Sequence, residues 1–224
     1  MFKSILITSL LLSSVSLLAQ DFDPTMEVSA VEITQIDVAP IETQIELPKI
    51  PMNPVDQVAM YVDGIIAIGK KVWPIIQAGM PVITTKGFSD SMSVLPAIEN
   101  PTTHAELNQM ANWSAPTAKS YRVSYKNYFN GEIASFVYTV MFQHGGTYKG
   151  VGKYITSLQV QASDVYAMYG IDFDASTELL NVANVGSEAD PVASAMLKVS
   201  YKVRGRTGSQ TFYVDGRGDL KVIQ

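Results

Sequence analysis

A two-residue alternation of apolar and polar side chains runs through the C-terminal half of the chain, and it is the feature that most limits the possible fold. Val123 and Tyr125 alternate with Arg122, Ser124 and Lys126, and similar runs recur up to the C-terminus. Successive side chains of a strand point to opposite faces of a sheet, so each run predicts a strand. The predicted strands cover residues 121–126, 133–142, 154–160, 165–173 and 197–203, followed by a hairpin of 211–214 and 220–223. This pattern predicts a mainly β protein, an antiparallel β-sandwich of seven or eight strands.

Residues 55–77 have a helical period instead. Val58, Val62 and Ile65 recur at steps of three and four, and Pro54 after Asn53 resembles the first turn of a helix. We therefore expect one N-terminal helix packed on the sandwich. Pro74 should kink or end this helix, because proline cannot donate the backbone hydrogen bond.

A membrane-active role for that helix is an alternative. Trp73 and the pair Lys70 and Lys71 are typical of an amphipathic helix at a membrane interface. A pore-forming-like protein would use the apolar side of this helix.

The first 19 residues predict export. Lys3 precedes an apolar run that ends at Leu18 and is followed by Ala19. The run is shorter than the roughly 20 residues that a membrane-spanning helix needs, which favours a signal peptide cleaved after Ala19. The expected location is periplasmic or extracellular.

Residues 20–54 form an acidic, proline-containing linker in this interpretation, and 55–224 form the helix plus β-sandwich domain. The linker has Lys49 as its single base and seven acids: Asp21, Asp23, Glu27, Glu32, Asp37, Glu42 and Glu46. Its prolines favour extended backbone. An alternative is that the alternation across residues 41–47 adds a strand to a sheet edge.

Composition excludes much catalytic chemistry. The chain has no Cys and two His, so thiolate metal sites and cysteine nucleophiles are absent. The Gly-rich run 145–153 lacks the spacing of a phosphate-binding loop and predicts a hairpin or bulge. A hydrolase with a carboxylate pair, or with His144 and an acid, stays open as an alternative. We expect no catalytic residue, no metal site and no cofactor.

Several segments resemble a group of secreted proteins of uncharacterised activity. The most specific is 145–154, Gly-Gly-Thr-Tyr-Lys-Gly-Val-Gly-Lys-Tyr, and others are 69–73, 135–138 and 184–193. The resemblance covers residues 60–220, and Pro74 departs from its pattern. It implies a single exported domain and assigns no site.

A row of cations is the best candidate for a binding surface. Lys198, Lys202, Arg204 and Arg206 alternate with apolar residues, so a regular strand would project all four from one face. Arg122 and Lys126 would add to this face if their strand is adjacent. Such a row predicts a non-catalytic protein that binds anionic lipid, acidic polysaccharide or another protein. We expect no nucleic acid partner, and the acidic linker could mask the row until a ligand competes.

Overall fold

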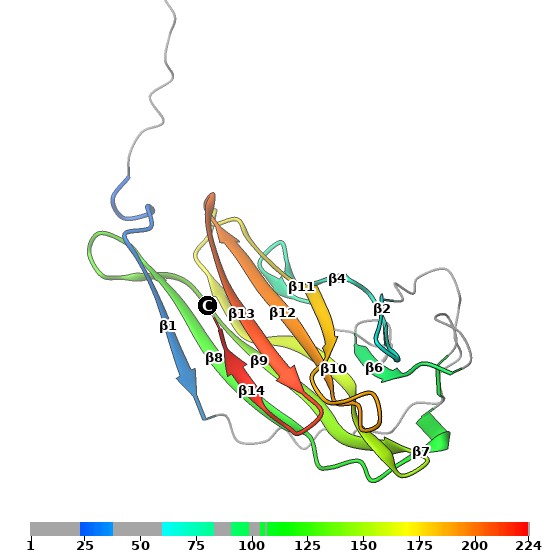
Figure 1. Cartoon of the computed structure of the whole chain (residues 1–224). Helices are drawn as coiled ribbons and strands as arrows, with labels where there is room; N and C mark the ends of the chain where they lie inside the picture. The colour runs from blue at the N-terminus through cyan, green and yellow to red at the C-terminus, as the bar shows by residue number, and fades with distance from the viewer. Residues whose placement is uncertain (1–22, 38–59, 83–90, 99–103, 106, 224) are drawn as a thin grey trace, which may run out of the picture.

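The chain folds mainly into antiparallel β-strands, which form two sheets in an arrangement consistent with a β-sandwich (Figure 1). The computed structural model describes residues 23–37, 60–82, 91–98, 104–105 and 107–223. The predicted signal peptide, the alternation at 41–47 and residues 55–59 of the predicted helix lie outside these ranges.

Sheet A has eight strands in the order β1-β8-β9-β10-β6-β3-β2, with β7 paired to β9. Their bounds are β1 Ala30–Ile36, β2 Met60–Val62, β3 Ile65–Ile68, β6 Met92–Pro96, β7 Met110–Ala111, β8 Thr117–Lys126, β9 Glu132–Tyr148 and β10 Val151–Ala167.

Sheet B has six strands in the order β14-β13-β12-β11-β4-β5. Their bounds are β4 Val72–Gln77, β5 Met80–Pro81, β11 Phe173–Asn184, β12 Ala193–Val203, β13 Arg206–Asp215 and β14 Leu220–Val222. A short 3-10 helix, Leu107–Gln109, precedes β7.

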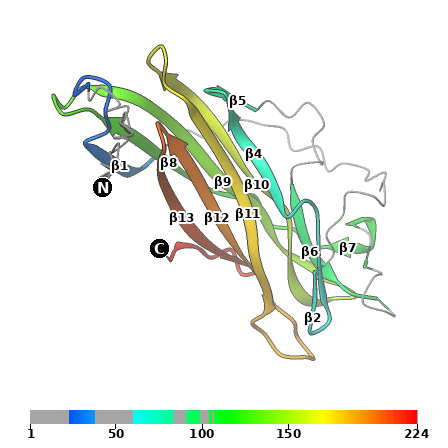
Figure 2. The ribbon, with the colours of Figure 1, turned by 90° about the horizontal axis from the view of Figure 1, so that it is seen from above.

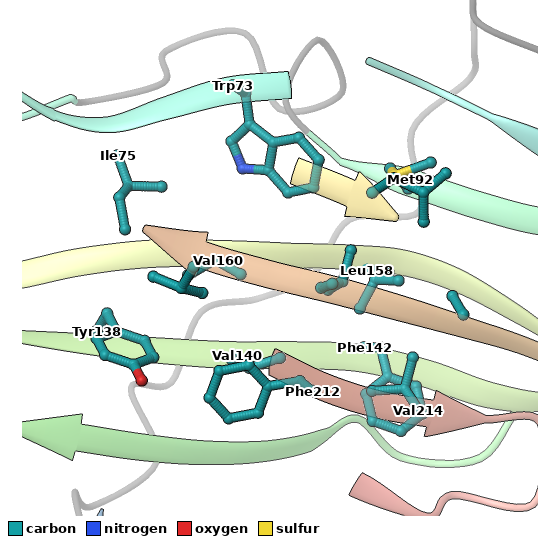
Figure 3. Close-up of a cluster of buried hydrophobic side chains, with 14 of the residues drawn as sticks. Trp73, Ile75, Met92, Tyr138, Val140, Phe142, Leu158, Val160, Phe212 and Val214 are labelled. Atoms are coloured by element: carbon teal, nitrogen blue, oxygen red, sulfur yellow. The ribbon is translucent and has the colours of Figure 1, made fainter. Parts of the chain in front are cut away.

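The core lies between the sheets and is rich in aromatic side chains (Figure 3). Phe136 of β9 is fully buried, and its ring centroid lies 4.9 Å from Phe173 and 5.5 Å from Tyr201 of sheet B. Phe212 of β13 packs against Tyr121 and Tyr138 of sheet A in the same way. These contacts hold the two sheets together.

The prediction of an N-terminal helix is wrong for residues 60–77, which form β2, β3 and β4. Residues 65–67 are buried on both faces of the strand. In a continuous apolar run of this kind, apolar residues also stand three and four positions apart, so the spacing of a helix appears without a helix. The backbone of Asp63 and Gly64 has positive φ, 45° and 79°, and turns β2 back onto β3. Asp-Gly is a strong signal for such a two-residue hairpin. Pro74 lies where β4 has a paired strand on one side only, because β5 pairs with Ile76 and Gln77, and a strand edge of this kind tolerates proline.

Gly69 marks the point where the chain passes from sheet A to sheet B. It separates β3 from β4 and has φ of 132°, a conformation that residues with a side chain rarely adopt. A Cβ atom there would lie 2.6 Å from the carbonyl oxygen of Ser91. Glycine therefore allows one continuous segment to contribute to both sheets.

Most of the strands predicted after residue 119 are confirmed in position, although several are longer. The strand predicted at 165–173 is wrong for its central residues, and β11 beyond Phe173 was not predicted. The predicted strand 154–160 lies within β10. The predicted strand 165–173 covers the end of β10, the turn at 168–172 and the first residue of β11. The Gly-rich run 145–153 forms the β9–β10 hairpin, and the predicted terminal hairpin is β13–β14. The number of strands exceeds the predicted seven or eight because the segments before residue 100 also join the sheets.

The acidic linker is also partly a strand. Its residues 30–36 form β1, which pairs in antiparallel register with β8, from Ala30 opposite Lys126 to Ile36 opposite Ser120. A segment of the linker thus adds to a sheet edge, as the alternative interpretation proposed, but it precedes the alternation at 41–47.

Candidate functional site

The predicted row of cations is divided by the fold. β12 ends at Val203, and Arg204 with Gly205 forms the turn into β13, so Arg206 begins the next strand. Arg206 pairs with Val203, whose side chain is buried, and it therefore does not share the outer face with Lys198 and Lys202. The prediction that four cations project together is wrong because the strand is not regular through Arg206.

Arg122 and Lys126 lie elsewhere. Both belong to β8 of sheet A, so they do not extend the face formed by Lys198 and Lys202. One guanidinium nitrogen of Arg122 donates to both carboxylate oxygens of Glu132, at 3.0 and 3.2 Å, and to Ser135. Lys126 forms an ion pair of 2.7 Å with Glu32 of β1. These two cations are engaged in contacts within the fold.

Arg204 is also paired. Its guanidinium lies 3.3 Å from the carboxylate of Glu27, in the segment before β1. Two acids of the linker, Glu27 and Glu32, therefore contact cations of the predicted set. Strand β1 itself lies at the edge of sheet A, where it does not cover the outer face of β12.

Lys198 and Lys202 line a groove of about 660 Å³ on the outer face of sheet B. Their strand alternates, so that Leu197, Val199 and Tyr201 enter the core while the lysines and Ser200 point outward. The polar groups that line this groove come from four strands: Gln77, Asp174, Ser176, Lys198, Ser200, Lys202, Thr207 and Ser209. Pro74 of β4 adds an apolar wall.

Charge in the groove is mixed, but the lysines stay available. Asp174 is opposite Lys202 in the β11–β12 register, and Glu178 is opposite Lys198. The Oδ1 atom of Asp174 accepts the backbone N–H of Ala78 at 2.9 Å. Among the described residues, neither lysine forms an ion pair. Tyr201, on the core side of β12, adds no charge, since burial raises its pKa to about 12.

Sequence reasoning identified the two lysines and Ser200 between them but missed the hydroxyl groups of the neighbouring strands. Ser176 of β11 and Ser209 of β13 pair with Ser200 from either side of β12, so their side chains lie on the same outer face. The signal was available in the alternation of 207–211, where Thr207, Ser209 and Thr211 recur at every second position.

For the hydrolase alternative that combines His144 with an acid, the structure brings in Asp215. The charge of Asp215 influences His144, but this carboxylate accepts the backbone N–H groups of Arg217 and Asp219 and the hydroxyl of Tyr213. Burial lowers the pKa of His144, while Asp215 opposes this shift. Asp215 thus fixes the β13–β14 turn. In the described part of the chain, no three residues of the types His, Cys, Asp and Glu gather into a metal-binding group.

None of the segments that the structure describes forms a helix with the length and apolar character needed to cross a membrane. Comparisons with family models, with curated proteins and with solved structures found no match. The resemblance to a secreted family therefore stays a prediction.

Proposed function

We propose that the protein is an exported, non-catalytic binding protein whose groove on sheet B takes up anionic groups of its ligand. The observation that supports this most is the pair Lys198 and Lys202, two cations without an ion-pair partner among the described residues, which project into a groove lined by hydroxyl groups. A lysine ammonium binds phosphate or carboxylate as a point charge, and neighbouring hydroxyls donate further hydrogen bonds. Export is supported by the sequence of residues 1–19.

The spacing of the lysines favours an extended ligand. They are four positions apart along β12, which corresponds to roughly 13 Å at about 3.3 Å per residue. A ligand that engages both needs anionic groups repeated over that distance, as on a lipid surface, an acidic polysaccharide or an acidic protein segment. The chain has a formal net charge of −5, so attraction to such a ligand has to come from these local cations and not from overall charge.

The test compares two double variants that lose the same charge. Lys198→Gln with Lys202→Gln removes the groove cations, and Lys149→Gln with Lys153→Gln removes exposed cations of the β9–β10 hairpin. Binding to an immobilised acidic polysaccharide and to vesicles containing phosphatidylserine is measured over a salt series. We expect the groove variant to bind about tenfold more weakly at low salt, with the difference shrinking as salt screens the charges.

Equal losses in the two double variants would contradict the proposal, because they would show that only net charge matters. Unchanged binding of the groove variant would contradict it as well. Circular dichroism of both variants checks that the sheets are intact.

A further inference from the structure

Large apolar side chains are exposed at the tips of three hairpins. Tyr169 in the β10–β11 turn is 101% exposed, Phe129 in the β8–β9 turn 70%, and Met80 after the β4–β5 turn 71%. Tyr128, beside Phe129, is 55% exposed. Side chains of this size and exposure are uncommon outside binding surfaces when they gather in one place.

These hairpins meet at one end of the sandwich. The N–H of Met168 donates to the carbonyl of Ile133 at 2.9 Å, which joins the β10–β11 turn to the start of β9. The N–H of Gly79 donates to Phe173 at 2.8 Å, which joins the β4–β5 turn to the start of β11. Figures 1 and 2 show the β4–β5, β8–β9, β10–β11 and β12–β13 turns at this end, which we call the hairpin end.

Cations flank the apolar tips. The β12–β13 turn reaches the same end, since the N–H of Arg204 donates to the carbonyl of Asp172 at 3.2 Å. This hairpin carries Lys202, Arg204 and Arg206. Glu27 neutralises Arg204, whereas Lys202 and Arg206 form no ion pair with a described residue. The acids near this hairpin are Asp172, Asp174, which is opposite Lys202 in the β11–β12 register and accepts a backbone N–H, and Asp23, whose carboxylate is influenced by the charge of Arg204.

We propose that the hairpin end docks on a lipid bilayer that contains anionic lipids. Tyr169, Phe129 and Met80 enter the interfacial layer, and Lys202 and Arg206 contact the headgroups. Aromatic side chains are favoured at this depth, because their apolar body meets the acyl chains while a tyrosine hydroxyl stays hydrated. Basic side chains beside them add attraction to anionic headgroups.

The arrangement favours a bilayer over a protein partner. The exposed side chains project from three separate turns, and a fluid surface can accommodate each of them independently. A protein partner would need a matching pocket for every tip. The proposal rests on the proposed function through Lys202, which belongs both to the groove and to the hairpin end, and it specifies the anionic surface as lipid.

The test removes the apolar tips and leaves the groove intact. The double variant Tyr169→Ser with Phe129→Ser is compared with Tyr61→Ser, which changes a tyrosine that is 48% exposed on β2, away from the hairpin end. Co-sedimentation is measured with vesicles of phosphatidylcholine and with vesicles that also contain phosphatidylserine. We expect wild type and Tyr61→Ser to bind the anionic vesicles, and the double variant to bind at least about tenfold more weakly.

Other results separate the two proposals. If the double variant binds anionic vesicles as tightly as wild type, docking through the tips is refuted while the groove stands. If wild type binds acidic polysaccharide through Lys198 and Lys202 but no vesicle, the ligand is a polysaccharide and the lipid proposal is overturned. If wild type binds neither, both proposals fail. Because the replaced side chains are exposed, melting temperatures should match wild type, and a fall would require the comparison to be repeated with the single variants Phe129→Ser and Tyr169→Ser.

Discussion

Replacing Gly69 with alanine tests whether one glycine allows the chain to cross between the sheets. At φ of 132° an alanine is strained by about 1–3 kcal/mol. Its Cβ would also lie 2.6 Å from the Ser91 carbonyl oxygen, a backbone atom that can move only with its strand. Relieving such overpacking costs about 1–3 kcal/mol more. We therefore expect Gly69→Ala to lower the free energy of unfolding by about 4 kcal/mol.

Gly64→Ala is the matched control. Gly64 also has positive φ, but a Cβ there meets no atom within 4 Å, so we expect a loss of about 1–2 kcal/mol from backbone strain alone. Urea unfolding followed by the fluorescence of the buried Trp73 gives both values. Equal losses for the two variants would refute the reasoning, because they would show that the contact with Ser91 imposes no constraint.

Three further changes test the core and the electrostatics. Phe136→Ala should cost about 3–5 kcal/mol in urea unfolding, since the ring is fully buried between the sheets, and a loss below about 1 kcal/mol would contradict that packing. Burial opposes ionisation of Glu132, but hydrogen bonds, one of them from Arg122, lower its pKa overall. The stabilising effect of Glu132 is therefore present above its ordinary pKa of 4.5 and is lost as pH falls through the lower pKa of the folded state. Thermal unfolding of Glu132→Gln should therefore vary less between neutral and acidic pH than that of wild type. NMR titration should place the pKa of His144 below 6.5, and Asp215→Asn should lower it further; a rise in that variant would be inconsistent with the geometry.

A strand such as β12 could be predicted from the sequence because it has one buried and one more exposed face. Val199 and Lys198, for example, differ sharply in polarity, and their alternation gives the period directly. Segment 65–68 could not be assigned in this way, since its residues are apolar on both faces and a period of two is then invisible. The Asp63-Gly64 pair was the local signal that favours a hairpin over a helix.

The candidate site was predictable only along its own strand. The alternation of β12 identified Lys198 and Lys202, but which strands lie beside it depends on pairing between distant segments. Ser209 and Asp174 reach the groove through that pairing, and Arg122 is excluded from it for the same reason. The turn at Arg204 likewise could not be distinguished from a continued strand by alternation alone.

Strand β1 has a consequence for how the protein is made. Its partner β8 lies roughly ninety residues later in the chain, and Ala30 at the start of β1 pairs with Lys126 at the end of β8. At about 5–20 residues per second, β1 waits roughly 5–20 s for its partner to be synthesised. During that time Val31 and Ile33 belong to an unpaired, β-prone segment, and the alternating Glu32 supplies a charge that discourages pairing with a second nascent chain. The carboxylate of Glu32 therefore has two roles: it discourages wrong pairing before β8 is made, and it forms an ion pair with Lys126, the last residue of β8, in the folded protein.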